Sequence, residues 1–86
     1  MPSHKLKIDE VYLNALLSGT KKSEIRYNDR DYQKDDVLEF NRYGISAETF
    51  YFRITHIHSG IGMDKNYVSL SVHQMFADPV EPPGGT

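Results

Sequence analysis

A two-residue alternation of apolar and polar side chains dominates the chain and is clearest in residues 49–58 (TFYFRITHIH). It is typical of a strand with one buried face, here the face that carries Phe50, Phe52 and Ile54. Shorter segments of strand character are residues 4–8, 22–27, 36–43 and 67–73. The side chains predicted to point inward are Leu6 and Ile8 in the first of these segments, Leu38 and Phe40 in residues 36–43, and Val68, Leu70 and Val72 in residues 67–73.

One helix is predicted between the first two strands. The side chain of Asp9 is placed to accept hydrogen bonds from the free N–H groups at the start of this helix. Gly19 is expected to end the helix in a left-handed conformation. The face predicted to be buried consists of Val11, Tyr12, Ala15 and Leu16, with Leu13 and Leu17 at its margin. Residues 44–47 are predicted to form a hairpin connection. Residues 59–66 contain two glycines and are predicted to form a mobile loop.

These elements predict an α+β, mostly β fold: a small, mostly antiparallel barrel of about five strands with the helix covering one end. An α+β sandwich is the alternative. Residues 1–76 are predicted to form a single domain, and the Pro- and Gly-rich residues 77–86 a disordered tail.

Composition narrows the class of protein. Eighty-six residues, 38% of them hydrophobic, suffice for one small core. The absence of cysteine excludes a disulfide framework and a thiolate metal site. No apolar run suits a signal peptide or a membrane span, so we expect a cytoplasmic protein without membrane contacts. The net charge of −2 argues against an extended binding groove for duplex DNA. Any contact with nucleic acid is expected to be local and to involve only a few phosphates or an unpaired base.

The most highly charged stretch is residues 19–36 (GTKKSEIRYNDRDYQKDD), in which five basic side chains balance five acidic ones. At its centre, Lys22, Glu24 and Arg26 are predicted to share one face of a strand, and the intervening odd-numbered residues the other. A row of unlike charges on one strand face suggests a polar cleft. The alternative is a ladder of exposed surface ion pairs.

The same stretch carries a family resemblance. Residues 19–26 (GTKKSEIR) fit the G-x-K-x-x-E-x-R signature of the ASCH domain, a branch of the PUA-like barrel superfamily. Residues 27–32 (YNDRDY), followed by Asp35 and Asp36, resemble in particular a small, uncharacterised ASCH-like family of bacterial and phage proteins, which reads E-I-R-x-N-D-R-D-[FY] and then G-D. The resemblance covers residues 4–73. Asp35 stands where that family usually has glycine, and Asp tolerates a positive φ better than most residues.

The resemblance implies a PUA-like barrel whose signature lines a cleft, with RNA, nucleotides or modified bases, single-stranded or unpaired, as ligands. Some ASCH-like relatives look like ribonucleases, or like amidohydrolases that remove an acyl group from a modified cytidine. In those amidohydrolases a hydroxyl residue stands where this chain has Glu24, and a separate downstream acid is the acid–base group. After Glu48, the candidate for that acid here is Asp64.

The candidate site residues follow from their chemistry. Lys21 and Arg26 could hold a phosphate, and Glu24 could accept from a base amino group or serve as a general base. Tyr27 and Tyr32 could stack on unpaired bases. The predicted ligand-binding set is Lys21, Glu24, Arg26, Tyr27, Asn28, Arg30 and Tyr32, with Lys21 and Glu24 catalytic if the protein is an enzyme.

Two further groups of polar side chains offer weaker metal-binding patterns. Residues 28–31 lack the ligand spacing of a calcium loop, and the alternative is a turn held by Arg30. His56 and His58 are predicted to point to the same side as Phe50, where they could share a metal or line the barrel rim. We predict neither a metal nor a cofactor.

Three functions remain open on the sequence. The first is a binding module for RNA or a nucleotide, with a positive pocket at Lys21, Arg26 and Arg30. The second is a hydrolase of RNA or of a modified nucleoside, with Glu24 as base and Lys21 stabilising negative charge. The third is a small phage-type interaction protein that binds a protein partner through a barrel face or a strand edge.

Overall fold

The computed structural model of the chain describes residues 2–42 and 48–76. Its elements, in chain order, are β1 (Ser3–Leu6), α1 (Glu10–Ser18), β2 (Ser23–Tyr27), β3 (Val37–Asn41), β4 (Thr49–His58) and β5 (Tyr67–Met75). The predicted strands and helix are all present, and the bounds of β4 are those expected from its alternation. The predicted hairpin connection at 44–47 and the predicted tail at 77–86 lie outside the described residues. No helix in the described ranges is long and apolar enough to cross a membrane.

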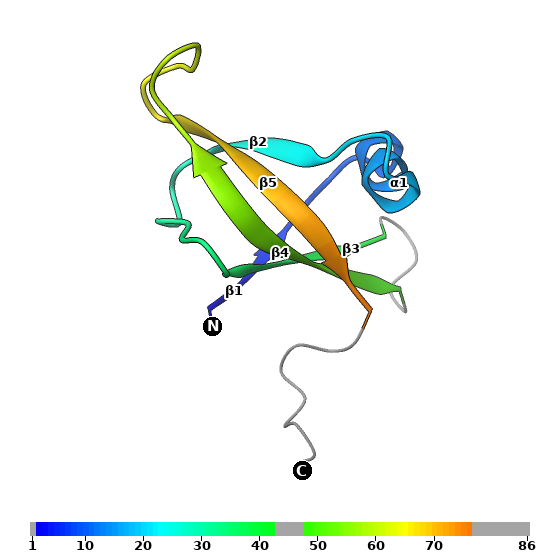
Figure 1. The fold of residues 1–86 in the computed structure, drawn as a ribbon. Coiled ribbons are helices and arrows are strands. Elements are labelled where there is room, and N and C mark those ends of the chain that lie inside the picture. Colours follow the sequence, from blue (N-terminus) through cyan, green and yellow to red (C-terminus); the bar gives the residue numbers. More distant parts are fainter. Residues whose placement is uncertain (1, 43–47, 77–86) are drawn as a thin grey trace.

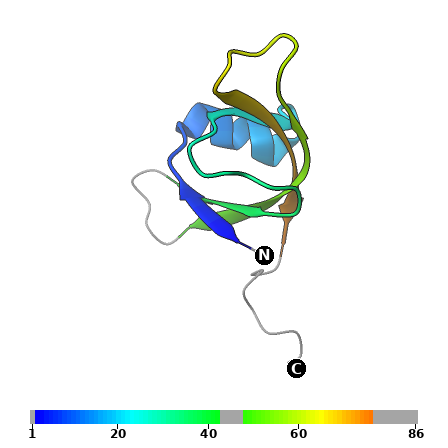
Figure 2. The same cartoon turned by 90° about the vertical axis from the view of Figure 1, so that its left-hand side faces the viewer.

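The strands form one sheet in the order β1-β3-β4-β5-β2, in which β1 and β3 run parallel and the other pairs antiparallel. The sheet curls into a half-barrel, and α1 lies at one end of it (Figure 1). Figure 2 shows the half-barrel from the side opposite α1, with α1 behind the strands. The mostly β, α+β class is therefore confirmed. Because β1 and β2 are the two edge strands, the half-barrel is open between them rather than closed by strand pairing as a full barrel would be.

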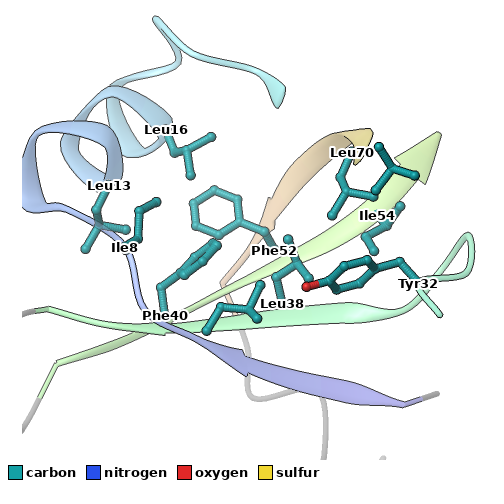
Figure 3. Close-up of a cluster of buried hydrophobic side chains, with 11 residues drawn as sticks. Ile8, Leu13, Leu16, Tyr32, Leu38, Phe40, Phe52, Ile54 and Leu70 are labelled. Carbon is teal, nitrogen blue, oxygen red and sulfur yellow. The ribbon is translucent and has the colours of Figure 1, made fainter. Parts of the chain in front are cut away.

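The hydrophobic core fills the space between α1 and the sheet (Figure 3). Its fully buried side chains are Leu13, Leu38, Phe40, Phe52, Ile54 and Leu70. The strand residues in this group are those predicted to point inward. Phe40 and Phe52 meet edge to face, with ring centroids 5.9 Å apart. This pair lies beneath the helix and joins β3 to β4.

The buried face of α1 differs from the predicted one. Leu13 and Leu16 are buried and Leu17 packs against the core, whereas Val11 and Tyr12 are 75% and 54% exposed. Apolar residues occur on both sides of this short helix, so its sequence offers two overlapping stripes of helical spacing. Contact with the sheet selects the stripe of Leu13, Leu16 and Leu17, so Leu16 is buried as predicted, whereas Val11 and Tyr12 face outward.

The ends of α1 match the prediction in part. Asp9 occupies the N-cap position, but its side chain makes no capping hydrogen bond, so the predicted cap is wrong. Its backbone carbonyl instead accepts from the N–H of Leu13 at 3.0 Å. Gly19 ends the helix with a φ of 84°, as predicted, and its N–H donates to the carbonyl of Leu16.

The two histidines of β4 do not lie on its inward face. The pairing of β4 with β5 shifts register between Ile54 and His56, and after the shift Ile57 packs against the core while His56 and His58 are exposed. A one-residue bulge reverses which side chains face the core. The predicted placement of both histidines on the side of Phe50 is therefore wrong.

Asp35 occupies a strained turn position before β3. Its φ is 77°, and its carboxylate accepts from the Arg53 guanidinium at 2.9 Å. We expect Asp35→Gly to be more stable than Asp35→Ala by about 1 kcal/mol, since both variants lose the ion pair but only alanine keeps a Cβ in the left-handed region. Urea unfolding of the two variants measures the difference. Equal stabilities would show that this turn holds no strain.

Candidate functional site

β2 turns its charged side chains toward the interior of the half-barrel. Glu24 is 8% exposed, while Ile25 and Tyr27 are 60% and 51% exposed. The two unlike faces predicted for this strand are thus present. Lys22 is exposed and precedes β2, so it does not belong to the inward row; Lys21 takes its place beside Glu24.

Glu24 is held between two cations. The Lys21 Nζ lies 3.0 Å from its Oε1, and the Arg26 Nη2 lies 3.0 Å from its Oε2. Lys21 also donates to the Ser23 carbonyl, and its ammonium lies 5.8 Å from the centre of the Tyr12 ring. The Lys21 and Arg26 side chains are only 27% and 22% exposed. This arrangement is a partly buried ion-pair cluster and not the exposed ladder weighed as the alternative.

Arg26 links the two open edges of the sheet. Its Nη2 donates to the Lys7 carbonyl, which follows β1, at 2.6 Å, and its guanidinium lies 5.8 Å from the centre of the Phe40 ring. The buried Nε has no hydrogen-bond partner within residues 2–42 and 48–76. An unsatisfied buried donor is costly, so this N–H favours any acceptor that can reach it.

Two pockets open beside Arg26 in the gap between the edge strands, and we call them together the edge cleft. The larger, the Glu24 pocket, has a volume of about 760 Å³ and lies between residues 7–12 and residues 24–27. The smaller, the Arg30 pocket, has a volume of about 350 Å³ and lies between residues 5–7 and residues 26–32. Both volumes fall in the range of small-molecule sites, about 300–1,000 Å³. Lys7, Arg26 and Tyr27 line both pockets.

The loop after β2 positions the remaining candidates. The Asn28 side chain accepts from the Tyr32 N–H at 3.3 Å, and the Asn28 N–H donates to the Asn66 carbonyl at 2.8 Å. Asn28 thus shapes the loop and does not line either pocket, whereas Arg30 and Tyr32 both line the Arg30 pocket. Tyr32 is buried and packs edge to face against the His4 ring, with centroids 4.9 Å apart.

Burial raises the pKa of the Tyr32 phenol above its ordinary value of 10.0, an effect that the Arg26 and Arg30 guanidinium groups partly offset. The folded protein therefore keeps this proton to higher pH than the unfolded chain. Its contribution to stability is complete below about pH 10 and is lost as the pH rises through the raised pKa.

We expect the free energy of unfolding of Tyr32→Phe to fall less steeply than that of the wild type above about pH 10. Urea unfolding at a series of alkaline pH values measures this slope. Tyr27→Phe, which changes an exposed tyrosine, is the control and should keep the wild-type slope. A wild-type slope in Tyr32→Phe as well would contradict the assignment.

One wall of the edge cleft, the segment from Lys5 to Tyr12, was not among the residues predicted from the sequence to bind a ligand. Lys5 and Lys7 alternate with the buried Leu6 and Ile8, so their outward position could have been inferred. Their approach to β2 could not, because it depends on how far the sheet curls. Tyr12 was assigned to the core and instead lines the Glu24 pocket.

The other polar groups considered lie away from the cleft. His58 donates through Nε2 to the Ile61 carbonyl at 2.9 Å, and Asp64 is exposed in the loop between β4 and β5, which projects from the half-barrel in Figure 1. Among the described residues, no group of three or more His, Asp or Glu side chains is arranged to hold a metal ion.

Comparison with known families places the described elements within a family model. The family model described as a domain of unknown function (DUF3850) matches residues 3–72, which include every described element from β1 to β4 and most of β5. No curated protein matches the chain. Since the matched segment spans most of the chain and the whole edge cleft, the chain belongs to the DUF3850 family.

Proposed function

We propose that this protein is a PUA-like, ASCH-type binding module for a nucleotide or for unpaired nucleotides of RNA, and that the ligand occupies the edge cleft. The observation that carries the proposal is the inward direction of the charged row on β2, which places Glu24 and Arg26 in a cleft large enough for a small molecule. Surface charges that serve only solubility do not need such a placement.

The chemistry of the cleft suits this ligand class. The Arg26 guanidinium presents planar donors that match phosphate or base acceptors, and the Glu24 carboxylate lines the larger pocket, where it can accept from a base amino group. Tyr27 is half exposed beside both pockets and offers a ring for stacking. The net charge of −2 is compatible with a contact limited to one or two nucleotides.

A hydrolase is the second candidate, because Lys21 and Glu24 converge. Their charged atoms are 3.0 Å apart, so the two groups are close enough to act on neighbouring atoms of one substrate. In this version Glu24 accepts a proton from the attacking water, and Lys21 stabilises the negative charge that develops on the substrate.

NMR titration of the ¹⁵N-labelled chain with short single-stranded RNAs and free nucleotides tests the binding proposal. We expect amide shifts to cluster at residues 7–12 and 19–30, with an affinity that decreases only gently with salt. Arg26→Gln should abolish the shifts, whereas the matched control Arg53→Gln, on the outward side of β4, should keep them. Shifts elsewhere, or none, would reject the proposal and favour a protein partner.

A cleavage assay then separates a binder from an enzyme. Wild type and Glu24→Gln are incubated with the RNAs that bind. Turnover by the wild type that is lost in Glu24→Gln would support the hydrolase, and absence of turnover in both would leave the binding module.

A further inference from the structure

The two pockets of the edge cleft differ sharply in charge. The Arg30 pocket is lined by four cationic side chains, Lys5, Lys7, Arg26 and Arg30, and by one acid, Asp29. The Glu24 pocket is lined by two cations, Lys7 and Arg26, and by three acids, Asp9, Glu10 and Glu24. Arg26 and Lys7 stand at the boundary and belong to both. One end of the cleft therefore attracts an anion, while the other does not.

Apart from Arg26, which pairs with Glu24, the cations of the Arg30 pocket are poorly neutralised by the protein itself. Among the described residues, neither Lys7 nor Arg30 forms a side-chain ion pair. Lys5 has a distant partner, with its Nζ 3.9 Å from Glu39, and its side chain is 80% exposed. Like charges gathered around one pocket repel each other, and a bound anion relieves that repulsion.

The Glu24 pocket has the opposite character. Exposed side chains of Tyr12, Ile25 and Tyr27 surround it, and each of them is more than half exposed. Large apolar and aromatic side chains left in water at the rim of a pocket are suited to a flat, uncharged ring. The Glu24 carboxylate beside them would repel a phosphate but accept from an amino group.

We propose that the edge cleft binds a nucleoside monophosphate unit in one direction, with the phosphate in the Arg30 pocket and the base in the Glu24 pocket. This inference rests on the proposed function. It adds the orientation of the ligand and a new binding residue, Lys7, which holds the phosphate together with Arg30. Arg26 lies beneath the junction of the sugar and the phosphate. The unit can be a free nucleotide or one unpaired nucleotide of an RNA.

Three probes on the ¹⁵N-labelled full chain separate the two ends of the ligand: inorganic phosphate, adenosine and AMP. We expect phosphate to shift the amides of residues 5–7 and 29–30, adenosine to shift those of residues 9–12 and 25, and AMP to shift both groups. Comparing AMP with a short single-stranded RNA then shows whether the free nucleotide or the RNA is the better source of the unit.

Variants of the phosphate-binding residues sharpen the test. Lys7→Gln keeps the backbone carbonyl that Arg26 requires, and we expect it to weaken AMP binding about tenfold, the loss of one charge-assisted hydrogen bond, while adenosine affinity is unchanged. Arg30→Gln should act in the same way. The matched control Lys34→Gln removes an exposed cation that lines neither pocket and should change neither affinity.

Two results would overturn the inference, and they have different meanings. If AMP shifts the cleft amides but Lys7→Gln and Arg30→Gln bind AMP as the wild type does, the orientation is wrong and the proposed function stands. If AMP, adenosine and RNA all leave the cleft amides unshifted, the proposed function fails, and the orientation fails with it.

Discussion

Replacing Phe40 with alanine is expected to lower the free energy of unfolding by about 3–5 kcal/mol, the range for removing a large buried aromatic side chain. Phe40 is fully buried, its ring packs against Phe52, and the Arg26 guanidinium lies over it. The substitution therefore opens a cavity in the core and at the same time removes the ring over which the Arg26 guanidinium lies. In a domain of this size, such a loss consumes much of the total stability.

Urea unfolding followed by far-UV circular dichroism measures this effect. Phe76→Ala is the matched control, because Phe76 is 88% exposed and its loss should change stability by less than about 0.5 kcal/mol. The more conservative Phe40→Leu keeps most of the apolar volume and should remain folded for binding experiments. A loss below about 1.5 kcal/mol in Phe40→Ala would contradict the packing described for β3 and β4.

Replacing Glu24 with alanine is expected to cost about 3 kcal/mol, because it leaves two partly buried cations without their shared counter-charge. Lys21 and Arg26 each lie 3.0 Å from a Glu24 oxygen, and both are largely shielded from water. The repulsion between Lys21 and Arg26 and the loss of their ion pairs with Glu24 both lower the free energy of unfolding. Without Glu24 the Arg26 side chain should also be less well fixed, so its hydrogen bond to the Lys7 carbonyl should weaken.

The control for Glu24 is Glu39→Ala on β3. Glu39 pairs with the 80% exposed Lys5 at 3.9 Å, so its loss should cost less than about 1 kcal/mol. Both variants are compared by urea unfolding at neutral pH. Equal losses would mean that the Glu24 cluster behaves as an ordinary surface ion pair, and the argument for a built charged site would then weaken.

Much of this fold could be predicted from local sequence patterns. The bounds of β4, the inward side chains of β3 and the end of α1 at Gly19 all follow from local patterns. The suggestion that Asp35 replaces a glycine also agrees with its positive φ. Each of these features depends on the residue itself and its immediate neighbours, which is why the sequence suffices.

The features that could not be predicted depend on contacts between distant segments. The helix sequence supports two apolar stripes, and only the sheet decides that Leu13 and Leu16 are buried. The bulge after Ile54, which turns His56 and His58 outward, is a property of the pairing with β5 and leaves the local alternation unchanged.

The candidate site was predictable in the same partial way. The unlike faces of β2, with Glu24 and Arg26 on the same face, follow from spacing. The opposite wall at Lys5 and Lys7 follows from the curl of the whole sheet, because the Arg26–Lys7 hydrogen bond joins positions 19 residues apart. No local pattern in the sequence indicates that these two positions are in contact.

The open order of the sheet has a mechanical consequence for the cleft. One wall is β2, and the other is the end of β1 with the chain that follows it as far as Tyr12. Since β1 and β2 are the two edges of one sheet, no ladder hydrogen bond of the described sheet crosses the opening. A change in curvature spread over five strands can move the walls apart without disrupting any strand pair. The Arg26 guanidinium, which donates to the Lys7 carbonyl, is one of the contacts that join the two walls, and we expect its loss to make the width of the cleft more variable.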